Sequence, residues 1–185
     1  MALDTRRYHG RMLRKILLIA LVLLALAILV GLALPTAYTI ESRLYMAAPA
    51  ARVHEHVSDL RRWPEWTTWS EASPQLVIEY GTQTTGVGAS QRWKDDSGEG
   101  RLVFTRCDEA GIAYDMAFLM GDGELPSQGV LRYEAKDGGT DVVWSMKGDL
   151  AIPVLGGWMR LLFLGAMQSD FDKSLAKLKR VVEAR

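Results

Sequence analysis

The chain has 185 residues, with 22 basic and 22 acidic residues and therefore a formal net charge of zero. This length allows a domain with a sizeable core, and because the sequence lacks a basic stripe, nucleic acid is not an expected partner. Cys107 is the only cysteine, which excludes an intramolecular disulfide.

The first element is an unbroken uncharged run from Ile16 to Leu34. At the helical rise its nineteen residues reach about 29 Å, close to the hydrocarbon thickness of a bilayer, so the run predicts a transmembrane helix. Five basic residues precede it in the tail 1–15, whereas only Arg43 and Arg52 lie within the next twenty residues. This bias predicts a cytoplasmic N-terminus and a domain outside the cytoplasm, such as the periplasmic side of a bacterial inner membrane.

A cleaved signal peptide is the alternative, because it shares the basic start. Its apolar core usually has about 7–15 residues and ends in a small-x-small site. Gly31-Leu32-Ala33 would put Pro35 just after the cut, and Pro35-Thr36-Ala37 has proline where a small residue is needed. We therefore expect an uncleaved anchor followed by one domain over residues 38–185.

Alternation of apolar and polar residues begins at Thr39–Met46 and predicts a first strand. Pro49 then stands at a plausible helix start, and apolar residues at spacings of four and three predict a short amphipathic helix over 50–60. A tryptophan-rich loop follows at 61–74. We expect its three tryptophans to close the open end of a sheet, with a ligand gate and a membrane-interface contact as alternatives.

Segments of period two come next, separated by turn residues such as Glu109-Ala110-Gly111 and Asp137-Gly138-Gly139. The predicted strands are 76–80, 89–93, 101–107, 112–120, 129–135 and 141–150. Such a run of strands after one strand and one helix indicates an antiparallel sheet in an α+β domain.

Helical spacing returns from about Val154 to Ala184 and predicts a long C-terminal helix that packs across the sheet. The stretch from Gly157 to Met167 is nearly apolar on every side. The slightly longer stretch from Val154 to Met167 contains Arg160 and three glycines, so it is too poor to span a membrane, and deep burial and interfacial contact remain the alternatives.

A set of short motifs follows these elements in order. They are Ala48-Pro49-Ala50 with Val53, Asp59 with Trp63, Trp66 and Trp69, Gly86-x-Gly88 with Trp93, Gly100, Thr140-x-Val142-x-Trp144, and Leu175-x2-Leu178-Lys179-x3-Glu183. Over residues 39–184 the chain resembles the START-like, or Bet v 1-like (SRPBCC), superfamily, specifically its polyketide cyclase/dehydrase and lipid-transport group.

The resemblance implies an α+β helix-grip fold, in which a curved antiparallel sheet wraps a long C-terminal helix, here preceded by one transmembrane helix. Family cavities between sheet and helix hold lipids, sterols, polyketides or other hydrophobic compounds, and apolar pockets suit such ligands. The candidate cavity residues are Trp66, Trp69, Trp93, Tyr114, Met116, Phe118, Trp144, Met146, Met159, Phe163, Met167 and Phe171. An ordinary filled core is the alternative for each of them.

Patterns for catalysis or metal binding are weak. His54 and His56 lie two apart on a predicted helix, so their side chains point about 200° apart and cannot hold one metal; we expect them on its surface. No histidine has an evident reason to approach Ser90 or Ser145, which leaves a serine nucleophile unsupported. The sequence thus predicts no catalytic residue, no metal and no cofactor.

Three functions follow from this pattern. The anchor and the cavity-type fold favour a membrane-anchored binding or transport module for a lipid or another hydrophobic small molecule. A polyketide cyclase/dehydratase-like enzyme is the first alternative and rests on the resemblance alone. An interaction or stress protein with a filled core is the second. The sequence does not indicate an oligomeric state.

Overall fold

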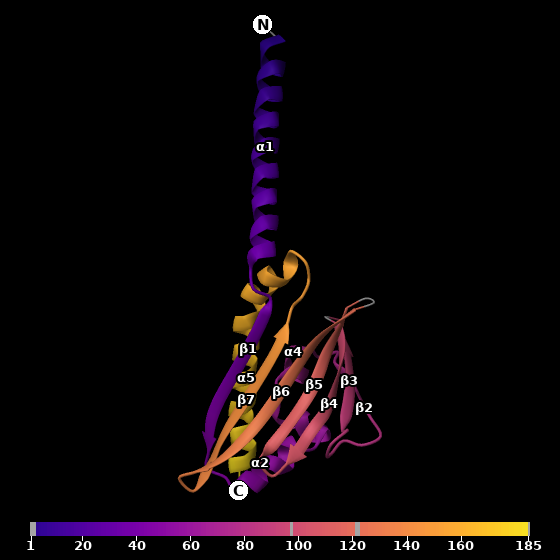
Figure 1. Cartoon of the computed structure of the whole chain (residues 1–185), viewed down its shortest axis with the longest axis vertical. Helices are drawn as coiled ribbons and strands as arrows, with labels where there is room; N and C mark the ends of the chain where they lie inside the picture. The colour runs from indigo at the N-terminus through magenta and orange to yellow at the C-terminus, as the bar shows by residue number, and fades with distance from the viewer. Residues whose placement is uncertain (1–2, 97, 121–122, 185) are drawn as a thin grey trace.

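The protein combines an N-terminal helix, a curved antiparallel sheet and a long C-terminal helix (Figure 1). The computed structural model describes residues 3–96, 98–120 and 123–184. Helix α1 (Leu3–Ala33) leads to strand β1 (Ala37–Met46), and helix α5 (Leu155–Glu183) is the last element. The predicted α+β helix-grip arrangement, with an apolar helix before it, is confirmed.

Within the described residues, seven strands form a single sheet in the order β1-β7-β6-β5-β4-β3-β2, and every neighbouring pair is antiparallel. Strands β2 to β7 therefore form a meander, and β1 pairs with β7. The other strands are β2 (Val77–Tyr80), β3 (Ser90–Asp95), β4 (Gly98–Asp108), β5 (Gly111–Met120), β6 (Gly123–Lys136) and β7 (Gly139–Asp149). The sheet bends around α5, so the core lies between the inner face of the sheet and this helix (Figure 1).

Strand β6 is longer than the alternation in the sequence indicates. The sequence predicts 129–135, whereas the strand begins at Gly123 and passes through Pro126. Pro126 lies opposite Ala117 on β5, but pairing with β7 begins only at Ser127. At the proline β6 has a neighbour on one side only, and such an edge tolerates a residue without a backbone N–H.

The segment between β1 and β2 contains more helix than the sequence predicts. Its elements are α2 (Ala50–Val57), the 3₁₀ turn η1 (Leu60–Arg62), α3 (Trp63–Trp66) and α4 (Trp69–Ala72). The predicted helix over 50–60 is shorter in the structure: α2 ends at Val57, and the backbone becomes extended at Asp59. The carboxylate of Asp59 accepts the N–H of Arg61 at 2.9 Å and so begins the 3₁₀ turn.

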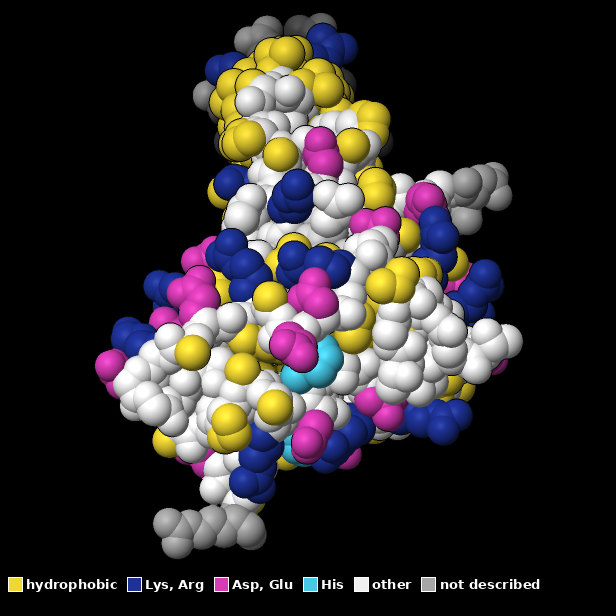
Figure 2. Space-filling view, turned by 60° about the horizontal axis from the view of Figure 1, so that its bottom comes forward, with side chains coloured by type: hydrophobic (Ala, Val, Ile, Leu, Met, Phe, Trp, Pro, Cys, Tyr) yellow, Lys and Arg dark blue, Asp and Glu magenta, His cyan; other side chains and the backbone are white. Residues whose placement is uncertain are grey.

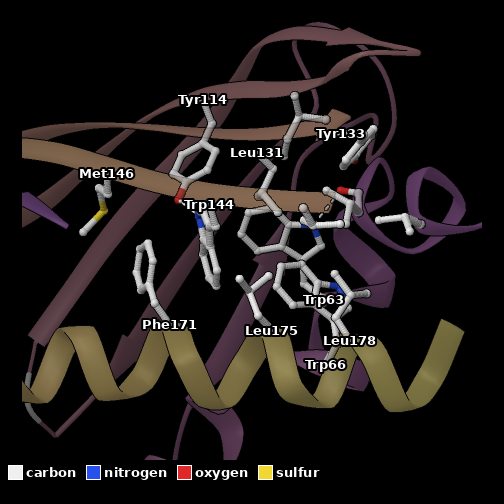
Figure 3. Close-up of a cluster of buried hydrophobic side chains, with 14 of the residues drawn as sticks. Trp63, Trp66, Tyr114, Leu131, Tyr133, Trp144, Met146, Phe171, Leu175 and Leu178 are labelled. Carbon is white, nitrogen blue, oxygen red and sulfur yellow. Dashed lines mark hydrogen bonds between the residues drawn. The ribbon is translucent and has the colours of Figure 1, made fainter. Parts of the chain in front are cut away.

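The tryptophan-rich segment supplies the centre of the core (Figure 3). Trp63 and Trp66 are buried, and their indole N–H groups donate to the carbonyls of Val57 at 2.8 Å and His56 at 3.1 Å. Both rings lie edge-on to Trp144 of β7. Trp63 and Trp66 are therefore core residues with satisfied N–H groups, whereas the third tryptophan of the loop, Trp69, is only half-buried.

The prediction that His56 lies on the surface is wrong. Its ring is buried, with Nδ1 2.9 Å from a carboxylate oxygen of Glu65 and Nε2 3.2 Å from the guanidinium of Arg62. Burial raises the pKa of Glu65, but the hydrogen bonds from Arg62 and His56 outweigh this and hold that pKa below its ordinary value. Helix α3 folds back over α2, which covers a histidine that the isolated helix would expose.

Helix α1 extends away from the domain, beyond the end of the sheet where α5 begins (Figure 1). Its segment Met12–Ala33 is long and apolar enough to cross a membrane, and nearly all of it is exposed. The predicted tail is helical from Leu3, while Met1 and Ala2 lie outside the described residues. Among the side chains that the structure describes, the buried apolar core draws on residues from Tyr38 to Val182, and none of them belongs to α1.

The end of α1, together with Leu34 just after it, contacts the first turns of α5. The indole N–H of Trp158 donates to the carbonyl of Ala27 at 3.3 Å, inside the apolar segment of α1. Gly157 packs against Leu34, and a side chain at this glycine would collide with it. The start of α5 therefore lies beside the C-terminal turns of the candidate membrane span.

Candidate functional site

A cavity of about 280 Å³ lies between the inner face of the sheet and α5. Strands β2, β3, β5 and β7 form one side, and α5 with the segment 69–76 forms the other. Eight of the predicted candidates line it: Trp69, Trp93, Tyr114, Met116, Phe118, Met146, Met167 and Phe171. The remaining lining residues are Ser73, Leu76, Ile78, Gln91, Asp95 and Asp170.

The other four candidates lie elsewhere. Trp66 and Trp144 are fully buried in the core behind the cavity, where other aromatic rings cover them. Met159 is half-buried and Phe163 is 50% exposed, and both belong to the first turns of α5, which extend past the end of the sheet (Figure 1). A side chain that faces the interior of the domain therefore does not necessarily line the cavity.

Aromatic side chains form the inner wall of the cavity, and ring stacking and a hydrogen bond hold them together (Figure 3). The ring of Phe171 stacks on Trp144 with centroids 3.9 Å apart, and the indole N–H of Trp144 donates to the Tyr114 hydroxyl at 3.0 Å. Gly129 lies opposite Tyr114 on β6, and a Cβ there would collide with the tyrosine ring. Burial raises the pKa of Tyr114, so its hydroxyl stays neutral and keeps a proton to donate.

Polar contacts fix the segment that carries Trp69 against α5. The backbone N–H of Thr68 donates to the hydroxyl of Ser174 at 3.2 Å. Lys177 donates to the carbonyl of Thr67 at 2.8 Å and to the carboxylate of Glu71 at 2.7 Å. The hydrogen bond from Lys177 lowers the pKa of Glu71. This wall of the cavity is therefore held to the helix by side chains outside the cavity.

Gln91 is the buried polar residue of the cavity lining, and the sequence pattern did not single it out. Its side chain lines the cavity and is only 2% exposed, and neither its amide nitrogen nor its amide oxygen has a hydrogen-bond partner among the described residues. Alternation along β3 puts Gln91 on the same face as Trp93, a predicted candidate. The alternation of inward and outward side chains around Trp93 therefore predicts that Gln91 also faces the cavity.

The described residues contain no group of three or more histidine, cysteine, aspartate or glutamate side chains placed to hold a metal ion. The acidic residues at the cavity, Asp95 and Asp170, come from the end of β3 and the middle of α5. Asp170 accepts a hydrogen bond from the hydroxyl of Thr68, and Asp95 accepts the backbone N–H of Gly98 at 3.0 Å. The site is thus a mostly apolar pocket with a few polar groups, which is a binding architecture.

A curved antiparallel sheet that grips a C-terminal helix over an apolar pocket defines the helix-grip class of proteins. The family described as "Polyketide cyclase / dehydrase and lipid transport" matches residues 38–183, and the chain belongs to this family, within the START-like, or Bet v 1-like, superfamily. No curated protein sequence matches the chain significantly.

Solved structures share the fold at low sequence identity. Protein CV1439 from Chromobacterium violaceum is 17% identical with a TM-score of 0.57, and the alignment covers 80% of this chain and 98% of that one. TTHA0849 from Thermus thermophilus is 20% identical with a TM-score of 0.57, covering 78% and 97%. Ara h 8.0201 is 17% identical with a TM-score of 0.54, covering 79% and 97%. The matched fold makes up nearly the whole of these three chains.

Proposed function

We propose that this chain is a membrane-anchored binding or transport module for a lipid or another hydrophobic small molecule. The observation that carries the proposal is the apolar cavity between the sheet and α5. Its volume of about 280 Å³ is close to the lower end of the usual range for small-molecule sites, about 300–1,000 Å³. Its methionines, Met116, Met146 and Met167, adapt to varied apolar shapes, which suits a flexible ligand.

The surface around the start of α5 supports the membrane part of the proposal. Large apolar side chains are exposed there, namely Leu155, Trp158, Leu161, Leu162 and Phe163. They continue the exposed apolar surface of α1, and Trp158 contacts α1 directly. The opposite end of the domain carries interspersed Lys, Arg, Asp and Glu side chains, as expected of a surface in water (Figure 2). An apolar collar beside a membrane span suits the lipid interface.

The cavity adjoins the same end of the domain. Phe118 lines the cavity near the end of β5, is itself partly exposed, and precedes the exposed Met120. Strand β5 ends, and β6 begins, at the end of the sheet nearer α1 (Figure 1). A ligand that leaves the cavity past Phe118 would therefore emerge toward the bilayer.

The binding function is tested by purifying residues 36–185 without detergent and analysing them by native mass spectrometry, followed by solvent extraction. We expect a hydrophobic compound bound at one molecule per chain, because an apolar cavity of this size favours an apolar ligand over water. An empty, folded domain that also takes up no fluorescent lipid would contradict the proposal and favour a filled core with an interaction role.

The orientation is tested with reporters fused to the C-terminus of the full chain. Because five basic residues precede the apolar run and two follow closely, we expect the N-terminus in the cytoplasm and the domain outside it. Alkaline phosphatase, which needs an oxidising compartment, should be active in the fusion, and a reporter that works only in the cytoplasm should be inactive. The reverse pattern would overturn this topology.

A further inference from the structure

The side-chain amide of Gln91 is a buried polar group at the cavity without a hydrogen-bond partner among the described residues. The residue lies on β3, opposite Leu102 of β4, and its side chain borders the cavity. Both amide atoms are shielded from solvent and make no hydrogen bond with the described residues. A buried amide normally has partners, because losing its bonds with water without replacement is unfavourable. The cavity is the free space beside Gln91, so a molecule within it is the available partner.

The chemistry of the amide narrows the kind of partner. Its NH₂ group donates and its carbonyl oxygen accepts, so a group that does both satisfies it best. A hydroxyl group has this property, and the hydroxyl of Tyr114 in the same cavity keeps a proton to donate to such a group. An alkane-like ligand would leave Gln91 unsatisfied.

The charged residues of the cavity lining disfavour a ligand with a negatively charged group. The carboxylates of Asp95 and Asp170 both belong to its lining, and no lysine or arginine does among the described residues. An ionised carboxylate or phosphate brought into this apolar space would lose its hydration without gaining a cationic partner from the lining.

We infer that the ligand is an uncharged, mostly apolar molecule with a hydroxyl group that Gln91 binds. This inference rests on the proposed binding function and specifies the ligand class of the same cavity. Gln91 then acts as a specificity residue. Of two apolar molecules with the same shape, it favours the one that places a hydroxyl group next to its amide.

The test compares three ring-matched probes by titration calorimetry with residues 36–185, near neutral pH. The probes are 2-naphthol, naphthalene and the ionised 2-naphthoate. We expect the wild-type domain to bind 2-naphthol at least about tenfold more tightly than naphthalene, and 2-naphthoate more weakly than 2-naphthol. In Gln91→Leu the preference for 2-naphthol should vanish, while naphthalene affinity is kept or improved.

Two controls separate recognition from folding. Arg92→Leu makes a comparable polar-to-apolar change at the next residue of β3, whose side chain is exposed, and should keep the wild-type preference. The urea midpoint of Gln91→Leu should equal or exceed that of the wild type, because the variant removes an unsatisfied buried amide.

The outcomes distinguish this inference from the proposed function. If wild-type domain and Gln91→Leu show the same ratio of 2-naphthol to naphthalene affinity, the role of Gln91 is overturned and the binding function stands. Tighter binding of 2-naphthoate than of 2-naphthol would overturn the uncharged ligand class. If no probe binds the wild-type domain, the binding function fails and this inference fails with it.

Discussion

Replacing Trp144 by alanine is expected to destabilise the domain by about 3–5 kcal/mol, the range for removing a large buried aromatic side chain. Trp144 is fully buried, stacks on Phe171 and lies edge-on to Trp63 and Trp66. Its removal would open a space where β7 meets α3 and α5. Urea denaturation of residues 36–185, followed by circular dichroism, measures the change.

Trp144→Phe is the matched control. It keeps an aromatic ring against Phe171 but loses the indole N–H that donates to Tyr114 at 3.0 Å. A buried tyrosine oxygen without this donor costs about 1–3 kcal/mol, so the phenylalanine variant should lie between the wild type and Trp144→Ala. Equal stability of the two variants would contradict the importance of ring packing at this position, since only the alanine variant loses it.

Blocking the cavity should abolish ligand binding without unfolding the domain. Ile78 lies on the inner face of β2 and lines the cavity, whereas its neighbour Val77 is exposed on the outer face of the same strand. In Ile78→Trp the indole would occupy part of the 280 Å³ space. We expect at least about a tenfold loss of affinity for 2-naphthol or for the co-purified compound, equivalent to about 1.4 kcal/mol or more.

Val77→Trp introduces the same side chain one residue away and should bind the ligand like the wild type. Both variants lie in a short strand at the edge of the sheet, where β2 is the last strand in the order and pairs with β3. Equal binding by the two variants would show that the ligand lies outside this cavity. Equal urea midpoints would establish that a loss in Ile78→Trp is due to occupancy of the cavity and not to unfolding.

Helix α5 contacts both the cavity wall and α1. The wall that carries Trp69 is held by Lys177 and Ser174 from the second half of α5, and the first turns of the same helix contact α1. One helix therefore carries the cavity wall at its centre and the apolar collar at its start.

Much of the architecture followed from local patterns. The uncharged run before Pro35 indicates a helix of membrane-spanning length because its composition and length admit few other structures. Period-two alternation located most of the strands, and helical spacing located α5 nearly to its ends. Local errors arose where a neighbouring segment changes the environment: Pro126 is tolerated because β7 is absent beside it, and His56 is buried because α3 covers it.

Which inward-facing residues line the cavity depended on the tertiary structure more than the strands and helices did. Alternation states which face of a strand a side chain occupies, but not whether that face meets another side chain or open space. Tyr114 and Trp144 both point inward, yet only Tyr114 borders the cavity, since Phe171, Trp63 and Trp66 cover Trp144. The sequence by itself determined the elements and their apolar faces through local spacing. Only the packing of segments far apart in the chain decided where space remains, and hence that Gln91 borders it.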